Sequence, residues 1–451
     1  MARKKKVKKL DAGNLFKKHL GKNKSSPRSL QTLVEKYKPN YFVTTQFPNL
    51  DMLLCWDDNA PWVRPGEETG EKNYGLPGNR VIEIYGESGA FKTYLGYMIP
   101  SEVVRQDGYA LNITTEYDVS LFPEIFYEEK TMTFLSTRRD DLDFRKDIDG
   151  IRHEFAVAPS FEEAEAVIGE FIKKLTALRK EGFDGPACIV LDSITNLRPA
   201  KVIKESLNDD PKKNNGGGAY GSGASEKHHL LGLMCEKCAE LDFFFLYLNQ
   251  TRDNLSGYGI KRKAASDNVV KWYPSLRIYV KSWNGDAKTL DGIKHKYGTV
   301  IQFMINKKRG FSVGDGKATV QHFEANDYYG FDEMEMLAEA SALSGLFTGA
   351  STKALTLREE YKDHPAQKFV EEFMKKHLKD KINKSGSNAG TISYPDGKVG
   401  AFFKETVEIE KEAGLPVGKF VMAIHTLNEL NGPIKVDHGH EDSITVVDFE
   451  E

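Results

Sequence analysis

A glycine-containing segment that follows an apolar run carries the residue types that bind phosphate. It reads Gly86-Glu87-Ser88-Gly89-Ala90-Phe91-Lys92-Thr93 and precedes a helical pattern from Tyr94 to Arg105. In such a loop, successive backbone N–H groups bind phosphate oxygens, the lysine reaches the terminal phosphates, and the threonine hydroxyl binds Mg²⁺. Phe91 stands where the usual pattern has glycine. Alone, the segment is equally compatible with a turn that binds nothing.

Polar side chains follow three other apolar runs, each at the point where the run ends. Asp192 ends the run 188–191, Glu116 follows the run 109–113, and Asn249-Gln250 follow the run 243–248. The carboxyl ends of parallel strands meet at one edge of a sheet, so we expect these side chains to lie near the phosphate loop. Asp192 would hold Mg²⁺ through water together with Thr93, Glu116 would activate the attacking water, and Gln250 would sense the terminal phosphate. The set predicts a site for ATP and Mg²⁺ that includes residues 86–94 and Asp192.

The elements that must position these residues form an α/β fold. Four runs, within 81–85, 109–113, 188–191 and 243–248, are nearly continuously apolar and alternate with helical patterns. Such runs are typical of parallel strands that are covered by helices on both faces. The runs 276–280 and 300–305 alternate more strongly and predict antiparallel strands at one edge.

In this order, the motifs resemble those of the RecA-family recombinases over about residues 75–335. Glu116 stands where the family has its catalytic glutamate, Asp192-Ser193 where it has its Walker B aspartate, and Asn249-Gln250 with Arg252 where its second DNA-binding loop begins. The segment 271–275 resembles the exit from that loop. The segment Asn306-Lys307-Lys308 resembles the one that reaches the neighbouring protomer's nucleotide. In having Phe91 at this position, the loop resembles that of the UvsX-type recombinases of T4-like bacteriophages, which also carry phenylalanine there.

The resemblance implies a RecA-like P-loop ATPase core and a DNA-dependent ATPase that converts ATP to ADP and phosphate. Protomers would form a helical filament on single-stranded DNA and pair it with homologous duplex in recombination and repair, with Lys307, Lys308 and Trp272 at the contact between protomers. Single-strand-binding and mediator proteins are possible helpers. An accessory or mediator ATPase that binds DNA without strand exchange would carry the same motifs. A metabolic P-loop kinase would show an Arg-rich lid in place of two Gly-rich loops.

Two segments combine cations with aromatic and glycine residues, which suits binding of single strands without sequence preference. We expect them to be loops at about residues 201–225 and 251–271. Polar loops are more often simply solvated, and the ATPase frame is what favours a DNA contact here. The candidate DNA-binding residues are Lys212, Lys213, Arg252, Tyr258, Lys261, Arg262, Lys263 and Lys271.

Charge is distributed unevenly along the 451 residues, although the formal net charge is only −3. Residues 1–24 hold ten Lys or Arg and one Asp, whereas residues 437–451 hold six acids and no Lys or Arg. Such ends are typical of interaction tails. The predicted organisation is a basic arm (1–29), an N-terminal region (30–74), the core (75–350), a C-terminal α+β domain (351–436) and an acidic tail (437–451). Residues 127–150 are highly charged and read as a surface insertion.

Composition excludes several other classes of protein. A 40% hydrophobic, 29% charged chain can bury a core, and it has no apolar run long enough for a membrane-spanning helix. With no apolar signal segment, we expect a cytoplasmic protein. The resemblance implies that the cell is bacterial or a phage-infected host. Four cysteines are too few for a disulfide framework, and Cys235 and Cys238 are expected as thiols on one face of a buried helix.

Overall fold

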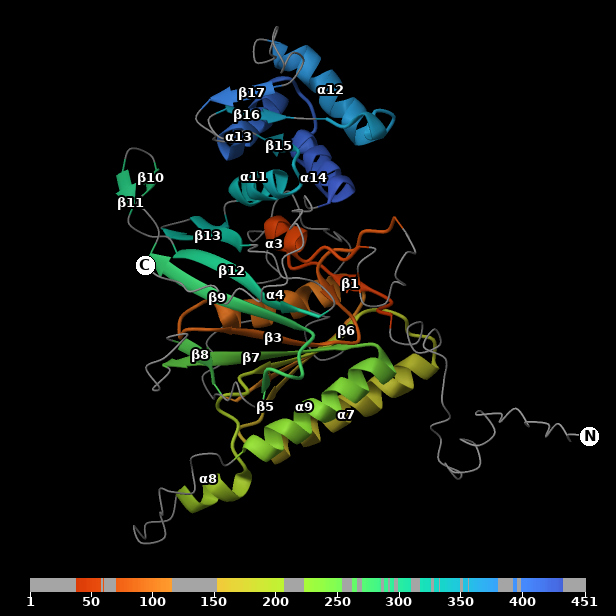
Figure 1. Ribbon diagram of the computed structural model, residues 1–451, viewed down its shortest axis with the longest axis vertical. Coiled ribbons are helices and arrows are strands. Elements are labelled where there is room, and N and C mark those ends of the chain that lie inside the picture. Colours follow the sequence, from red (N-terminus) through yellow and green to blue (C-terminus); the bar gives the residue numbers. More distant parts are fainter. Residues whose placement is uncertain are drawn as a thin grey trace, which may run out of the picture.

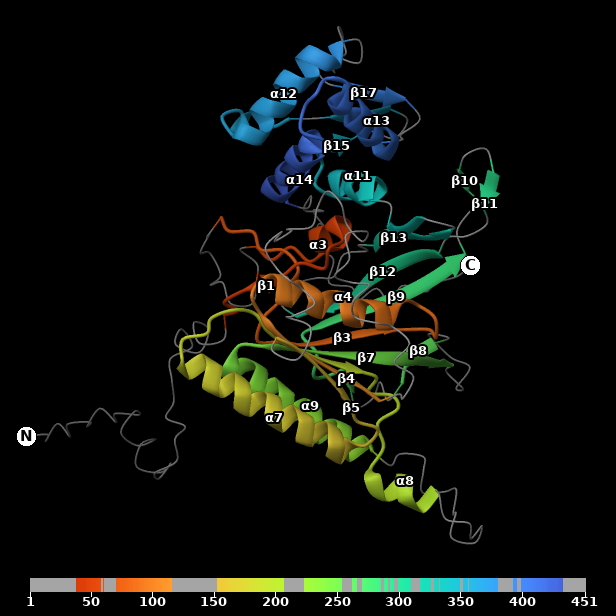
Figure 2. The same ribbon diagram turned by 180° about the vertical axis from the view of Figure 1, so that it is seen from behind.

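The structure is a computed structural model, and Figures 1 and 2 show it from opposite sides. It describes residues 38–57, 60, 70–115, 152–206, 223–253, 262–265, 270–284, 288–290, 293–295, 299–309, 317–325, 328–331, 333–348, 352–355, 357–379, 392–395 and 399–432. The predicted basic arm, the charged insertion 127–150 and the acidic tail lie outside these residues.

A ten-stranded mixed sheet forms the core, in the order β14-β13-β12-β9-β3-β7-β6-β4-β5, with β8 paired to β7 (Figure 1). Six strands join in parallel, namely β9 (Leu276–Asn284), β3 (Val81–Gly86), β7 (Phe244–Asp253), β6 (Ala187–Asp192), β4 (Tyr109–Thr114) and β5 (His153–Val157). The antiparallel members are β12 (Thr299–Lys308), β13 (Lys317–Ala325), β14 (Tyr328–Phe331) and β8 (Arg262–Ala264). The predicted α/β class with a mainly parallel sheet is confirmed.

Helices cover both faces of the sheet (Figures 1 and 2). On one face lies α4 (Lys92–Arg105), and on the other lie α7 (Phe161–Lys180) and α9 (Ala224–Leu241). Successive residues of each strand face opposite sides, so that Ile82 packs with α4 while Val81 packs in the cluster that contains α7 and α9 residues. Burying each such side chain stabilises the fold by about 1.5–3 kcal/mol. This two-sided burial explains the continuous apolar runs.

The structure corrects one of the two predictions made for the runs after residue 275. The strand at 276–280, β9, pairs in parallel with β3, so it belongs to the parallel part of the sheet. The run 300–305 lies in β12, which is antiparallel to β9 as predicted. The alternation of β9 arises because one of its faces is only partly covered, which is independent of strand direction.

The two segments expected as loops contain regular structure at their ends. Strand β7 continues to Asp253 and pairs with β8, so a β-hairpin begins where the loop 251–271 was expected. Helix α8 (Ala200–Ser206) starts the other segment, and α9 begins at Ala224. Residues 207–222, 254–261 and 266–269 are not described.

The N-terminal region packs between the core and the C-terminal unit. It contains β1 (Phe42–Val43), which pairs with β2 (Leu76–Pro77), and α3 (Pro48–Leu53). Asn49 of α3 contacts two elements: its Nδ2 donates to the carbonyl of Thr319 in β13 (2.9 Å) and to the carboxylate of Glu339, a residue of the helix 333–343. Toward the core, Tyr41 Oη donates to the Ala187 carbonyl (2.8 Å). The region thereby connects β6 with β13.

The C-terminal unit has a separate hydrophobic cluster. Its elements are α11 (Glu333–Leu343), β15 (Phe347–Thr348), β16 (Thr352–Leu355), a 3₁₀ turn (Glu359–Tyr361), α12 (Pro365–His377), β17 (Ile392–Pro395), α13 (Val399–Glu412) and α14 (Lys419–Asn431). β15, β16 and β17 form an antiparallel sheet, in agreement with an α+β unit. Met336 of α11 packs in the core cluster, whereas Met334 and Leu337 pack in the C-terminal cluster. Helix α11 therefore joins the two, and its packing places the start of the C-terminal unit before residue 351.

A small hairpin of β10 (Lys288–Leu290) and β11 (Ile293–His295) extends beyond β9. Within the described stretches, the helices are too short or too polar to span a bilayer.

Candidate nucleotide site

The phosphate loop runs from the end of β3 to the start of α4, as predicted. A Cβ atom at Gly86 would lie 2.1 Å from the Val280 carbonyl oxygen, so the close approach of β9 requires glycine there. Gly89 and Phe91 both have left-handed backbone conformations, with φ of 74° and 66°. Glycine adopts this conformation at little cost, whereas phenylalanine does not. The Phe91 ring packs against Tyr94, with 4.2 Å between the ring centroids, and this contact offsets part of the backbone strain.

Lys92 is the first residue of α4, and its ammonium group lies within the loop. Its Nζ donates a hydrogen bond to the Glu87 carbonyl. Burial lowers the pKa of Lys92, and the nearby negative charge of Asp192 opposes that shift. The amine is thus folded back onto the loop that it would serve, close to an acidic partner.

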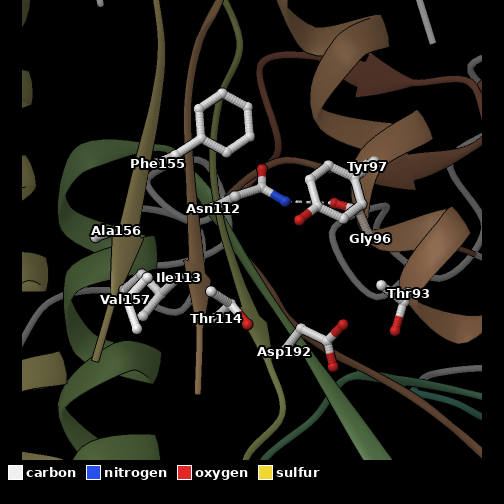
Figure 3. A pocket seen from close by; sticks show the side chains of 10 residues that line it. All are labelled: Thr93, Gly96, Tyr97, Asn112, Ile113, Thr114, Phe155, Ala156, Val157 and Asp192. Atoms are coloured by element: carbon white, nitrogen blue, oxygen red, sulfur yellow. Dashed lines mark hydrogen bonds between the residues drawn. The ribbon is translucent and has the colours of Figure 1, made fainter. Parts of the chain in front are cut away.

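Thr93 and Asp192 line one pocket, which is drawn in Figure 3. Their oxygen atoms turn toward the same space, with the Thr114 hydroxyl at the adjacent strand end. Thr93 comes from the start of α4, Asp192 from the end of β6 and Thr114 from the end of β4. The topology therefore brings together the two residues that the sequence predicted as the Mg²⁺ site.

The backbone around Asp192 is held by Thr115, the residue directly after β4. Thr115 N donates to the Asp192 carbonyl (2.7 Å), and Thr115 Oγ1 accepts from Ser193 N (3.1 Å). Ser193 Oγ is buried and has no hydrogen-bond partner among the residues that the structure describes. Glu116, the predicted general base, follows Thr115 immediately but lies outside the described residues.

These residues fit a nucleotide with Mg²⁺. The loop offers backbone N–H groups at the start of α4, Lys92 offers a cation, and Thr93 and Asp192 offer the oxygen ligands that Mg²⁺ prefers. The unpartnered hydroxyl of Ser193 is a buried polar group next to them, where a bound ligand or water would satisfy it. Tyr94, also predicted to bind nucleotide, is instead buried in the core cluster beneath the loop.

The amide pair Asn249-Gln250 lies within β7, level with the end of β3, and its two members have different roles. Asn249 is fully buried, and its Nδ2 donates to Glu83 Oε1 (2.8 Å) and to the Ala265 carbonyl (3.0 Å). The side chain of Gln250 is partly exposed, and its backbone N donates to Thr195 Oγ1 (3.0 Å). Gln250 thus stands beside the Asp192 turn, where the sequence predicted a phosphate sensor.

A buried ion pair lies behind this edge of the sheet. Glu83 of β3 is fully buried, and Arg277 of β9, in the paired register position, donates to it through Nε. Burying a charge without a partner is costly, so the two residues depend on each other. Sequence reasoning missed the pair, although a glutamate in the middle of a buried apolar strand is itself a signal of a buried partner.

The structure describes the backbone of several predicted DNA-binding residues. Arg252 lies opposite Lys263 in the β7–β8 hairpin, and Asp253 lies opposite Arg262. Lys271 is partly buried, and its Nζ lies 5.1 Å from the centroid of the Trp272 ring. Four candidates, Lys212, Lys213, Tyr258 and Lys261, lie outside the described residues.

The three predicted inter-protomer residues have different surroundings. Trp272 is 67% exposed. Lys307 is partly buried, and its Nζ donates to the Lys271 carbonyl (2.9 Å) next to Trp272. Lys308 is buried and donates to the Cys55 carbonyl, with its Nζ 4.5 Å from the centroid of the Trp56 ring. The prediction of an inter-protomer contact for Lys308 is therefore corrected, because its ammonium group binds its own N-terminal region.

The far wall of the pocket comes from β5, which the sequence did not predict as a strand. Phe155 and Val157 of β5 are 40% and 43% exposed, and Phe155 stacks with Tyr97 of α4, with 6.2 Å between the ring centroids. Beneath them, His153 Nε2 lies 2.8 Å from Asn112 Oδ1. Burial lowers the pKa of His153 to about 3, so the ring is neutral. The short apolar run Phe155-Ala156-Val157 was the available signal in the sequence.

The predicted cysteine pair lies as expected. Cys235 and Cys238 are free thiols on α9, where Cys238 is fully buried and Cys235 is partly buried. Burial raises the pKa of both thiols, which keeps them protonated and unreactive.

The chain is similar in sequence to several known proteins. No protein-family model matches the chain. It is 27% identical over 234 residues to the plasmid protein RecA of Lactococcus lactis subsp. lactis, over 52% of this chain and 57% of that protein. For the RecA protein of Helicobacter hepaticus the identity is 24% over 209 residues (46% and 50% of the two chains), and for that of Oleidesulfovibrio alaskensis it is 23% over 237 residues (52% and 56%).

The chain spans only about half the length of the curated relatives that it matches. Their shared name agrees with the α/β core and with the resemblance of the motifs. Over about half of its length, the chain is similar to several proteins named RecA.

Proposed function

We propose that the protein is an ATP-dependent strand-exchange recombinase that forms a helical filament on single-stranded DNA and pairs it with homologous duplex. The observation that carries this proposal is the convergence of Lys92, Thr93 and Asp192 at one sheet edge, beside Gln250 at the base of the β7–β8 hairpin. A nucleotide site and a candidate DNA-binding hairpin thus share strand β7. The relatives named RecA support the same assignment.

In the proposed reaction, the chain holds ATP through its loop N–H groups and through Lys92. Thr93, and Asp192 through water, would hold Mg²⁺, which would neutralise charge on the phosphates. Glu116 accepts a proton from the attacking water, and Gln250 contacts the terminal phosphate. Loss of that contact after hydrolysis releases the hairpin from the single strand. Because Phe91 replaces glycine, we place the protein nearest the UvsX-type recombinases of T4-like phages.

The filament contact is proposed at the surface that carries Trp272. Trp272 is exposed, and Lys307 and Arg309 both donate to backbone carbonyls of its segment, which holds the backbone that carries the ring. Within a filament, Lys307 and Trp272 would face the nucleotide of the next protomer. Arg252, Arg262 and Lys263 of the hairpin would neutralise DNA phosphates.

The test is ATP hydrolysis by the full chain with and without single-stranded DNA. We expect the DNA to raise turnover at least about tenfold, and Lys92→Ala to lower turnover at least about 100-fold, because the lysine stabilises charge on the transferred phosphate. Lys38→Ala, at an exposed surface ion pair, is the matched control and should behave as the native chain. An ATPase that is indifferent to DNA contradicts the proposal. A DNA-stimulated ATPase that exchanges no strands favours the mediator alternative.

A further inference from the structure

The turn after Asp192 carries a hydroxyl group that the proposed mechanism does not use. Thr195 lies three residues beyond Asp192, and its Oγ1 makes two hydrogen bonds to β7. It accepts from Gln250 N (3.0 Å) and donates to Asn249 Oδ1 (2.8 Å). Both directions of the hydroxyl are therefore used, and both are directed to the amide pair Asn249-Gln250 of β7.

The other side of this connection reaches the base of the β7–β8 hairpin. Asn249 Nδ2 donates to the Ala265 carbonyl (3.0 Å), and Ala265 N donates to the Gln250 carbonyl (2.7 Å). Ala265 directly follows β8, which pairs with β7. The residues that close the candidate DNA-binding hairpin are thereby linked through Asn249 to Thr195.

The turn itself has few ways to move independently of this connection. Ile194 N donates to the Leu248 carbonyl (3.1 Å), and Ser193 N donates to Thr115 Oγ1 (3.1 Å). Asn249 is also anchored from behind, by the fully buried Glu83. Because Asn249 is fully buried, a lost hydrogen bond there is not replaced by water, which makes the arrangement of the network all-or-none.

We propose that Thr195 is a positioning residue through which the β7–β8 hairpin controls the nucleotide site. When DNA displaces the hairpin, the displacement reaches the turn of Asp192 through the hydrogen bonds from Ala265 to Asn249 to Thr195. Thr195 also fixes the backbone of Gln250 against the same turn. The inference rests on the proposed function, since it names the route by which DNA stimulates ATP hydrolysis.

The test uses Thr195→Val in the full chain, because valine has the same shape but no hydroxyl. We expect the ratio of kcat with to kcat without single-stranded DNA to fall about tenfold, the size of a typical coupling between two sites. The KM for ATP should change less than about twofold, since no contact to the nucleotide is removed. Binding of a fluorescent oligothymidine should be retained. Thr195→Ser keeps the hydroxyl and should restore the ratio.

Thr176→Val provides the matched control. Its Oγ1 donates only to the Ile172 carbonyl (2.6 Å) within α7, away from the pocket, and the ratio should be that of the native chain. Thermal melting checks the fold of each variant, and Thr195→Ala gives the same readout if Thr195→Val melts early.

A native ratio in Thr195→Val, or an equal loss in Thr195→Ser, overturns the inference. The response of the native chain's ATPase to DNA distinguishes a failure of this inference from a failure of the proposed function. If its ATPase does not respond to DNA, the proposed function fails, whereas a DNA-stimulated native chain with an equally stimulated Thr195→Val rejects the positioning role alone.

Discussion

At the carboxyl edge of the central sheet, buried polar groups connect residues of different strands, whereas in the C-terminal unit the buried Glu410 caps a helix. Thr115 joins β4 to the end of β6, and Asn249 joins β7 to β3. In the C-terminal unit, the buried carboxylate of Glu410 accepts from Gly418 N (2.6 Å) and Phe420 N (2.7 Å) at the start of α14. The first set lies beside a pocket, and the second is enclosed in a hydrophobic cluster.

The difference shows how buried polar groups that could bind a ligand differ from those that only stabilise the fold. Glu410 satisfies N–H groups that every helix leaves unpaired at its start, so its hydrogen bonds serve the fold. At the sheet edge, Ser193 Oγ stays without a partner among the described residues, and Thr93 and Asp192 direct oxygens into open space. The sheet edge therefore keeps polar capacity for a ligand, whereas the Glu410 carboxylate is occupied by its two N–H donors.

The largest effect on stability is expected from the substitution of Glu410. In Glu410→Ala two buried N–H groups lose their acceptor, and we expect the free energy of unfolding to fall by about 3 kcal/mol. ATP turnover per folded molecule should stay at the native value, because the carboxylate contacts the start of α14 in the C-terminal unit. Denaturant unfolding and steady-state ATPase assays measure the two quantities.

Glu408→Ala on the same helix is the control. Glu408 is exposed and pairs only with Lys411 (2.7 Å), so its loss should change stability by less than about 0.5 kcal/mol. If Glu410→Ala lowered turnover while the chain remained folded, the two regions would not be separate in function.

A smaller effect, confined to acid, is expected beneath the pocket. Burial lowers the pKa of His153 to about 3, so only the unfolded chain binds this proton between about pH 6.5 and 3. The stability from His153 is complete above about pH 6.5 and is lost by about 1.4 kcal/mol per pH unit as the pH falls. In His153→Gln, unfolding between pH 6 and 4 should depend less on pH by this amount.

The comparison with the variant is needed because other groups titrate in the opposite sense. Burial raises the pKa of Asp51 to about 7, so its contribution is complete at low pH and is lost as the pH rises toward 7. Native and His153→Gln chains share that contribution, and it cancels between them. Equal pH slopes in the two chains would show that His153 is protonated in the folded state.

The smallest effect concerns the loop residue Phe91. Its left-handed backbone costs any residue with a Cβ about 1 kcal/mol relative to glycine. Phe91→Gly and Phe91→Ala both lose the contact with Tyr94, so Phe91→Gly should be more stable by about 1 kcal/mol in thermal or denaturant unfolding. Equal stabilities would mean that the loop relaxes out of this conformation.

The sequence predicted the sheet well, and it located residues that the fold brings together at one sheet edge, because these signals are local. Apolar runs that are buried on both faces, such as 188–191, identify parallel strands, and the polar residues after them mark the edge. The direction of β9 was wrong because alternation reports the burial of the two faces and carries no information on strand direction.

Cross-strand partners were beyond the reach of the sequence. Thr115, Thr195 and the members of the Glu83–Arg277 pair lie 54 to 194 positions from their partners, and their role depends on register. Lys308 was misplaced for the same reason, since only the packing of the N-terminal region against β12 shows that its ammonium group is covered.

Electron microscopy of the full chain on single-stranded DNA with a non-hydrolysable ATP analogue tests the central proposal most directly. The account predicts regular helical filaments on the DNA, which Lys92→Ala does not form under the same conditions. Protein-coated DNA without a regular helix, or no assembly at all, would contradict the proposed recombinase.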